Sequence, residues 1–320
     1  MKNAGRFIGI DGGGTHSKAV MVDRALQVIR RTQGDCLNYY SICFDRAREN
    51  FRMLIERLLD GDDLSNIQGV FIGMSAIDRE ETSEVVARFA GDLFPNARIY
   101  MHSDLYIALM SLTLGEPGII LVSGTGTMAL AVDAQGREYL AGGYGYLLGD
   151  QGSAFSIAEA ALRLALKAFD GVARKTALQE AMLSHFQLGD HRDIIKKVYT
   201  SDNPRKCISS FAVEVTNAAM KGDDGAMRVL CESARYLADV TTSLIRQIDS
   251  SCLERIGIYG GVFENDGIVN RLYRDYMAKS YPALRIERPC IPSELGAAIA
   301  AMKRAGIPVR PEMLKSVEGM

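Results

Sequence analysis

The stretch RFIGIDGGGTHSKAVMVD, residues 6–23, decides the fold. A short apolar run ends at Asp11, three glycines and a threonine follow, and a second apolar run leads to Asp23. This pattern predicts two buried strands joined by a tight turn. Glycine turns after buried strands expose backbone N–H groups and allow a bulky ligand to approach closely. Phosphate is the ligand that gains most from such a turn.

A similar pattern recurs in GIILVSGTGTMALAVDAQG, residues 118–136. Thr15 and Thr125 are 110 residues apart, and so are Asp23 and Asp133. Two alike strand–turn–strand openings at a fixed offset predict duplicated half-molecules. The alternative is a chance match between short glycine-rich stretches.

Neither turn fits the commonest phosphate-binding motifs. GGGTHSK lacks the Gly-Lys-Ser/Thr ending of a P-loop, and GTGTMA, residues 124–129, is followed by an apolar strand pattern where a dinucleotide fold needs a helix. The interpretation that remains is a pair of facing hairpins that bind the phosphates of a nucleotide from both sides. Asp11 would then hold a hydrated Mg²⁺. The alternatives are that the glycines serve hairpin geometry alone and that Asp11 only begins a turn.

The bulk composition is that of a globular protein with two domains of ordinary size: 320 residues, 48% hydrophobic and 24% charged, with a net charge of −2. This charge does not favour nucleic acid as a partner, and no apolar run is long enough to predict a membrane span. We see no pattern of a signal peptide. Scattered cysteines without a CxxC pair favour a reducing compartment, so a cytoplasmic protein is expected.

The rest of the chain reads as alternating helices and strands. Residues 44–61 and 79–94 have helical spacing of apolar residues, and residues 153 to about 250 are nearly all helical in pattern. A strand pattern then reaches the glycine pair Gly260-Gly261, and a helix rich in small residues, 293–306, closes the chain.

Five segments together carry a family resemblance. They are IGIDGGGTHSKAV, HSDLYIAL, LVSGTGTMALAVDAQG, GGYGYLLGDQGSAFSIA and IYGGVF. In this order they resemble the N-acetylglucosamine kinase branch of the actin/hexokinase/heat-shock-ATPase superfamily, and the wider BadF/BadG/BcrA/BcrD family shared with activator ATPases of acyl-CoA dehydratases. The resemblance implies an α/β fold of two ribonuclease-H-like (actin-like ATPase) domains flanking a nucleotide/sugar cleft. It places the first domain at residues 1–115 plus 290–320, and the second, with a helical insertion, at 116–289.

The resemblance also implies roles for the glycine turns. In such kinases both hairpins bind the phosphates of ATP, the acid of the first turn holds Mg²⁺ through water, and the glycine pair near the C-terminal end contacts adenosine. The matching positions are Asp11, Gly13, Gly14, Thr15, Gly124, Thr125, Gly126, Thr127, Gly260 and Gly261.

The acid that follows the fourth strand of the first domain is the catalytic base in similar kinases, and it also contacts the sugar. The HSD segment puts Asp104 there, although an aspartate before LYIALM is equally typical of a helix N-cap. Neighbouring His102 is expected to be a packed or surface histidine rather than a proton relay.

The sugar site implied by the resemblance is formed by Asn38, Gly142, Gly143 and Asp150, together with Asp104. Asp150 has the alternative role of a helix N-cap. The sequence departs from the family's GDEGS motif at Gln151, which leaves the acceptor open. Tyr39 and Tyr40 could stack on a sugar face or simply pack.

The sequence therefore predicts an ATP- and Mg²⁺-dependent amino-sugar kinase that phosphorylates a 6-hydroxyl, with N-acetylglucosamine as the first candidate acceptor and a homodimer as the expected assembly. The alternatives are an activator-type ATPase, which needs cysteines close to the second phosphate turn, and a non-catalytic sugar sensor. No cysteine lies between Cys43 and Cys207.

Overall fold

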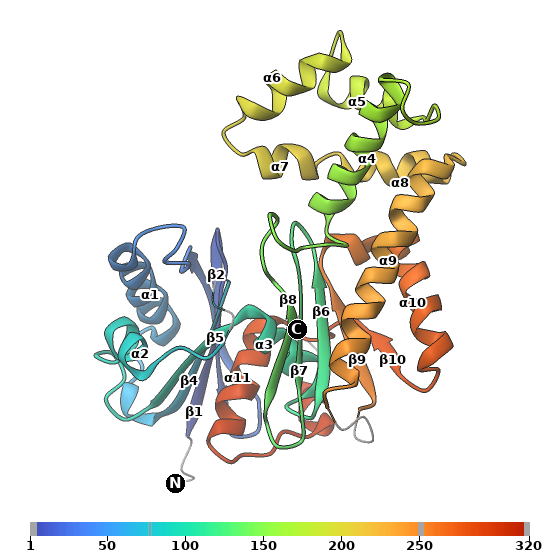
Figure 1. The fold of residues 1–320 in the computed structure, drawn as a ribbon. Helices are drawn as coiled ribbons and strands as arrows, with labels where there is room; N and C mark the ends of the chain where they lie inside the picture. The colour runs from blue at the N-terminus through green and yellow to red at the C-terminus, as the bar shows by residue number, and fades with distance from the viewer. Residues whose placement is uncertain (1–4, 76, 78, 249–252, 317–320) are drawn as a thin grey trace. The chain divides into compact units, whose positions relative to one another are not determined.

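The computed structural model describes residues 5–75, 77, 79–248 and 253–316 (Figure 1). The chain divides into two compact units. Unit 1 comprises Met1–Pro117 and Arg288–Met320, and unit 2 comprises Gly118–Glu287. Within the described residues, each unit is built on one mixed five-stranded sheet.

The sheet of unit 1 has the strand order β3-β2-β1-β4-β5. The β1–β2 and β2–β3 pairs are antiparallel, whereas β1–β4 and β4–β5 are parallel. The strands are β1 (Arg6–Gly12), β2 (His16–Asp23), β3 (Val28–Asp35), β4 (Ile67–Met74) and β5 (Arg98–Ser103). Because β1, β4 and β5 run in the same direction, their carboxyl ends lie at one edge of the sheet.

Helices cover both faces of this sheet. Figure 1 shows two of them on one face, α1 (Phe44–Leu59) and α2 (Ser83–Ala90), and two on the other, α3 (Asp104–Thr113) and α11 (Ser293–Arg304). The segment 79–94 is helical over a shorter stretch than its pattern predicts, because Thr82 caps α2 by accepting a hydrogen bond from the Val85 N–H.

The C-terminal helix α11 packs directly onto β1 and α3, so the end of the chain completes unit 1. Two glycines allow this close approach. A Cβ on Gly9 would lie 2.1 Å from the carbonyl oxygen of Glu294, and a Cβ on Gly296 would lie 2.1 Å from the carbonyl oxygen of Ile107. Any larger residue at either position would force the helix away from the sheet.

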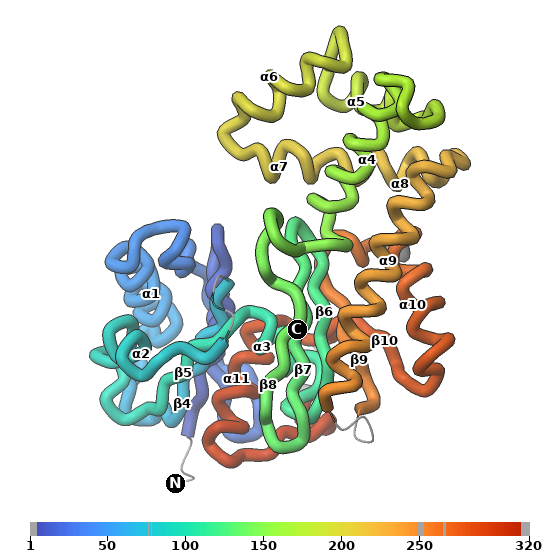
Figure 2. The backbone as a smooth tube through the Cα atoms, in the orientation of Figure 1, coloured from blue at the N-terminus to red at the C-terminus, as the bar shows by residue number. Residues whose placement is uncertain are grey.

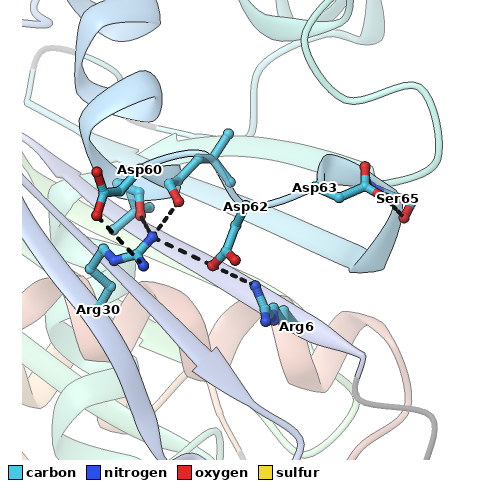
Figure 3. A network of polar contacts seen from close by, with 8 residues as sticks. Arg6, Arg30, Asp60, Asp62, Asp63 and Ser65 are labelled. Carbon is cyan, nitrogen blue, oxygen red and sulfur yellow. Dashed lines mark hydrogen bonds and ion pairs between the residues drawn. The ribbon is translucent and has the colours of Figure 1, made fainter.

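A polar network anchors the end of α1 to the sheet (Figure 3). Arg30 on β3 donates to the carbonyl oxygen of Leu58 at 2.9 Å and forms an ion pair with Asp62 at 3.4 Å. Arg6 on β1 donates to the same Asp62 carboxylate at 2.8 Å. Partly exposed ion pairs of this kind contribute about 0.2–1 kcal/mol each, so the network mainly fixes how α1 leaves the sheet.

Unit 2 repeats the sheet topology of unit 1, with the order β10-β9-β6-β7-β8. The β6–β7 and β7–β8 pairs are antiparallel, whereas β6–β9 and β9–β10 are parallel. The strands are β6 (Gly118–Ser123), β7 (Thr127–Val132), β8 (Glu138–Gly142), β9 (Arg255–Tyr259) and β10 (Arg285–Glu287). The matching order of strands is the duplication that the 110-residue offset predicts.

The repeat extends to single hydrogen bonds. The Asp23 carboxylate accepts from the backbone N–H groups of Ala25 and Gln27, and the Asp133 carboxylate accepts from those of Gln135 and Arg137. Each aspartate thus closes the turn between the second and third strands of its sheet. Chance similarity of glycine-rich stretches does not account for such a match.

Most helices of unit 2 lie between β8 and β9 in the chain, and α10 follows β9. They are α4 (Ala154–Phe169), α5 (Leu178–Phe186), α6 (Ile194–Tyr199), α7 (Pro204–Ser209), α8 (Ala212–Met220), α9 (Asp224–Ile245) and α10 (Ile268–Ser280). Figure 2 shows α5, α6 and α7 as an outlying group that is joined to the sheet region through α4 and α9. None of the helices in the described part of the chain is long and apolar enough to cross a membrane.

Candidate active site

The first glycine turn lies at the edge of the unit 1 sheet where three parallel strands end. Asp11 stands next to last in β1, and the turn passes through Gly13 and Gly14 into β2. The carbonyl oxygen of Gly12 accepts from the Ser75 N–H that follows β4, at 3.3 Å. The turn, the residue after β4 and the residue after β5, Asp104, therefore share one edge.

Asp11 is half-buried, and its pKa is raised to about 6. Desolvation is the largest cause, and the negative charges of Asp104 and Glu294 raise the pKa further, while Lys18 opposes them. Glu294 lies in the first turn of α11 and is 6% exposed. Two further carboxylates therefore raise the pKa of Asp11 at this edge, an arrangement that a divalent cation would relieve.

Asp104 is the first residue of α3 and follows β5, the fifth strand of unit 1 in the described residues, rather than the fourth strand that the sequence indicated. The N-cap is the preceding Ser103, whose hydroxyl accepts from the Tyr106 N–H at 3.2 Å. The N-cap role that the sequence left open for Asp104 therefore belongs to Ser103. The Asp104 carboxyl group keeps a solvent-exposed side, yet protein atoms surround most of it. This desolvation raises its pKa, although the N–H groups of Leu105 and Asp104 partly offset the effect.

Asn38 adjoins the first turn through Ser75, to whose hydroxyl its side-chain amide donates at 3.3 Å. Its side-chain oxygen accepts from the N–H groups of Tyr40 and Ser41. The Tyr39 ring packs against Phe44 and Phe89, and its hydroxyl donates to Glu81, whereas Tyr40 is 71% exposed. Tyr40 is therefore the more exposed ring of this pair.

His102 is buried and stacks on Tyr106, with 4.3 Å between ring centroids. Its Nδ1 accepts from the Ser103 N–H at 2.7 Å. This places His102 within the core beneath the edge, where the stacked ring supports the start of α3.

The second glycine turn links β6 and β7 in unit 2. The Gly124 N–H donates to the carbonyl oxygen of Gly126 at 2.9 Å, which closes the turn. Thr125 lies at its tip. Ser123, at the end of β6, is buried and donates to the carbonyl oxygen of Gly152 at 2.9 Å.

Three further glycines assigned from the sequence, Gly142, Gly143 and Gly260, lie against this second turn. Gly142 and Gly143 have positive φ values of 79° and 77°, and the Gly143 N–H donates to the carbonyl oxygen of Thr127 at 2.9 Å. Gly260 has φ 101°, and a Cβ there would lie 2.4 Å from the carbonyl oxygen of Ser123. The adjoining Gly261 faces open space. Gly260 thus brings the segment after β9 against the second turn, which a larger residue would prevent.

Asp150 is 4% exposed and is held in the left-handed region, with φ 62°. Its carboxylate accepts from the Thr127 N–H at 3.0 Å and pairs with the Arg205 guanidinium at 3.0 Å. It does not cap α4, because the hydroxyl of Ser153 performs that function. Gln151 beside it is exposed.

Three residues of these two clusters were not assigned from the sequence: Ser75, Glu294 and Arg205. The sequence holds no signal for Arg205, which lies 55 residues from Asp150 in a helical segment. Ser75 could have been found as the residue that ends the buried strand pattern 67–74, and Glu294 as a lone acid in an otherwise small and apolar helix.

The described residues include no group of three or more histidine, cysteine or acidic side chains arranged to hold a metal ion directly. Cys36, Cys43, Cys207, Cys231 and Cys290 are free thiols, and Cys252 lies outside the described residues.

Comparison with known proteins places the two units in the actin-like ATPase fold. A solved structure from Chromobacterium violaceum, described as a candidate N-acetylglucosamine kinase, aligns with a TM-score of 0.67 at 21% identity and covers 93% of this chain and 99% of that chain. This likeness establishes the fold.

The family follows from the sequence comparison. Residues 8–302 match the BadF/BadG/BcrA/BcrD ATPase family, and the chain belongs to it. An N-acetyl-D-glucosamine kinase of Dictyostelium discoideum is 32% identical over 92% of this chain and 97% of that protein. An N-acetylmuramic acid/N-acetylglucosamine kinase of Clostridium acetobutylicum is 30% identical over 92% of this chain and 97% of that protein. The predicted resemblance is therefore confirmed.

Proposed function

We propose that this protein is an ATP-dependent amino-sugar kinase that transfers the γ-phosphoryl group of ATP to the 6-hydroxyl of N-acetylglucosamine, with Asp104 as general base. The observation that carries the proposal is the position of Asp104. Its carboxylate follows β5 at the edge where the Asp11 turn also lies, within one compact unit. The two relatives named as N-acetylglucosamine kinases support the choice of acceptor.

In the proposed reaction, Asp104 accepts the proton of the sugar hydroxyl. Phosphoryl transfer requires positioning, neutralisation of charge and a group that accepts the proton of the attacking hydroxyl. The 6-hydroxyl oxygen would bond to the γ-phosphorus, its proton would pass to the Asp104 carboxylate, and ADP would leave. The raised pKa of Asp104 makes it a stronger base than an exposed aspartate.

The phosphates of ATP would be bound by the backbone of the two turns, through Gly13, Gly14 and Thr15 in unit 1 and Gly124 to Thr127 in unit 2. Gly260 and Gly261 would contact adenosine. Mg²⁺ fits this arrangement because Asp11 carries an excess of nearby negative charge. Asp11 would hold the ion through water, and the ion would neutralise charge on the phosphates.

The residues assigned to the sugar are Asn38 and Asp104 in unit 1 and Gly142, Gly143 and Asp150 in unit 2. Asn38 offers an amide that is now bonded to the Ser75 hydroxyl, so a sugar hydroxyl could replace that partner. Asp150 is engaged by Arg205 and by the Thr127 N–H, which leaves it less acceptor capacity than a free carboxylate.

The test is ADP release by the purified protein with Mg-ATP and a panel of N-acetylglucosamine, glucosamine, N-acetylmannosamine, N-acetylmuramic acid and glucose. We expect one amino sugar to stimulate release by orders of magnitude. The 6-deoxy analogue of that sugar should bind and fail to stimulate, because it lacks the attacking hydroxyl. Mass spectrometry and ³¹P NMR of the product locate the phosphate.

ADP release that is equally fast without sugar would mean a stand-alone ATPase, such as an activator of the same family, and would refute the kinase. Sugar binding without any ADP release would instead mean a sensor. Stimulation by the 6-deoxy analogue would keep the kinase and refute the 6-hydroxyl as the acceptor.

We also propose that the protein acts as a homodimer in the cytoplasm. The homodimer rests on the family resemblance, and the location rests on the scattered cysteines of the sequence. Light scattering coupled to size exclusion measures the mass directly, and a mass of one chain of 35.0 kDa would refute the dimer.

A further inference from the structure

Arg205 occupies a central position beside the second glycine turn. It is carried by α7, in the outlying group of helices that Figure 2 shows beyond the sheet of unit 2. Its guanidinium reaches back to the turn and donates from Nη2 to the carbonyl oxygen of Thr125 at 3.2 Å and to the Asp150 carboxylate at 3.0 Å. One side chain thus joins the helical insertion to the turn assigned to phosphate.

The ion pair is packed onto the turn itself. A Cβ on Gly126 would lie 2.9 Å from Arg205 Nη2 and 2.9 Å from Asp150 Oδ2. A larger residue at this position would make the guanidinium and the carboxylate shift, so glycine lets both rest directly on the backbone of the turn. The two atoms are the same ones that form the ion pair, so the ion pair itself lies against the turn.

The loop between β8 and α4 is tied to the same guanidinium. The ring centroid of Tyr146 lies 5.4 Å from Arg205 Cζ, and the ring also packs edge-on against Phe155. The loop begins at Gly142 and Gly143 and ends at Asp150, so it contains three of the residues assigned to the sugar site.

The electrostatic consequence concerns the phosphates. Asp150 is 4% exposed and its carboxylate bonds to the Thr127 N–H within the turn. A buried carboxylate at this place would repel the anionic phosphates of ATP unless a cation compensates it. Arg205 is the cation that the structure pairs with it.

We propose that Arg205 is a positioning residue of the ATP site: by neutralising Asp150 and holding it against the Gly124–Thr127 turn, it lets the turn accept phosphate. This inference rests on the proposed binding of ATP phosphates by that turn, but it does not require the acceptor to be N-acetylglucosamine. Arg205 acts here through Asp150, without itself bonding to the phosphates.

The test compares Arg205→Met with a double variant that also carries Asp150→Asn. The readout is binding of the non-hydrolysable analogue AMP-PNP in the absence of sugar. We expect Arg205→Met to weaken binding at least tenfold, because it leaves Asp150 charged and unpaired beside the turn. Asp150→Asn in the same chain should restore most of that loss, because the repelling charge is gone. Arg205→Lys should fall between, since it keeps the charge and loses the forked geometry.

Adenosine binding and a matched arginine provide the controls. Adenosine carries no phosphate, so its affinity should be the same in all four proteins if each is folded, which thermal melting checks. Arg163→Met removes an exposed arginine that pairs with Glu159 in α4, away from the turn, and should leave AMP-PNP binding unchanged.

Two results would overturn the proposal. If the double variant binds AMP-PNP as weakly as Arg205→Met, Arg205 contacts the phosphates directly. If Arg205→Met binds as well as the unaltered protein, Asp150 needs no compensation. Binding is measured without an acceptor, so a protein that binds AMP-PNP but phosphorylates no sugar would refute the kinase and leave this inference standing.

Discussion

Replacement of Asp104 by asparagine separates the catalytic role of this side chain from its structural one. Asparagine keeps the shape and the polar contacts of the helix start and removes the ability to accept a proton. The N-cap hydrogen bond that the Tyr106 N–H donates to the Ser103 hydroxyl does not involve Asp104, so α3 should still form. The perturbation is therefore close to a pure change of charge.

The expected magnitudes differ strongly between catalysis and stability. A positioned general base contributes about 10²- to 10⁴-fold, so kcat should fall by that factor, or about 3–5 kcal/mol in the barrier. Stability should change by no more than about 1 kcal/mol. The loss of a favourable charge at the N-terminus of α3 costs about 0.3–1 kcal/mol, and the removal of a desolvated carboxylate offsets it.

The assay is the pH profile of kcat with saturating Mg-ATP and the stimulating sugar. Asp104 must be ionised to act, and its pKa lies above the ordinary range. Activity should therefore rise with pH along an acid limb placed above about pH 3.9, the ordinary pKa of an aspartate. Asp104→Asn should lose that limb while the Kd for AMP-PNP changes less than threefold.

Glu84→Gln is the matched control, because Glu84 also lies in the first turn of a helix, α2, and its side chain is exposed. It should keep full kcat. The base assignment is refuted if Asp104→Asn retains kcat within threefold, or if its lost activity is matched by an equal loss of AMP-PNP affinity.

Three further outcomes follow from the same two units. The pKa of Asp11 is about 6 in the folded chain and 3.8 for an unperturbed aspartate, so the folded state loses stability as pH rises between those values. Asp11→Asn should therefore raise the free energy of unfolding by about 1–3 kcal/mol at pH 7.5 in EDTA and leave it unchanged below pH 3.8, as urea titrations would measure. The same variant should abolish kinase activity, as ADP release would measure. Gly9→Ala should destabilise unit 1 by about 1–3 kcal/mol or more, because the new Cβ would lie 2.1 Å from the carbonyl oxygen of Glu294; Gly189→Ala, whose Cβ would lie 3.9 Å from its nearest neighbour, is the control, and equal melting of the two refutes the packing argument. Gln151→Glu adds an exposed charge, so it should change the free energy of unfolding by no more than about 0.5 kcal/mol. It should also lower the KM for cationic glucosamine relative to that for neutral N-acetylglucosamine by about 1.4- to 5-fold. Steady-state kinetics in low salt would detect this effect or rule it out.

Local patterns were sufficient to predict the strand openings of both units. Alternating or continuous apolar runs around Asp11 and around Thr125 define buried strands, and glycines between them define turns. The offset of 110 residues even predicts that the two sheets share one strand order. These features depend on neighbours in sequence, which is why a single chain reveals them.

Tertiary partners could not be predicted in the same way. Ser103 and Asp104 are both good N-cap residues, and only the start of α3 in space decides between them. Glu294 reaches Asp11 from the far end of the chain because Gly9 lets α11 lie on β1. Arg205 reaches Asp150 through a helical insertion whose fold no short pattern encodes. Such pairings are set by packing between distant elements.

The duplicated turns differ most in the charge that surrounds them, and this difference suits two tasks. The first turn has Asp11 in its own strand and gains Asp104 and Glu294, so it is rich in negative charge, which Lys18 offsets only in part. The second turn gains a carboxylate only through Asp150, and that carboxylate is paired with Arg205. An acidic turn attracts a divalent cation, whereas a glycine turn whose neighbouring charge is neutralised suits an anion. Under the proposed function, the first turn would hold the cation while both turns bind phosphate, because distant residues set the charge at each copy.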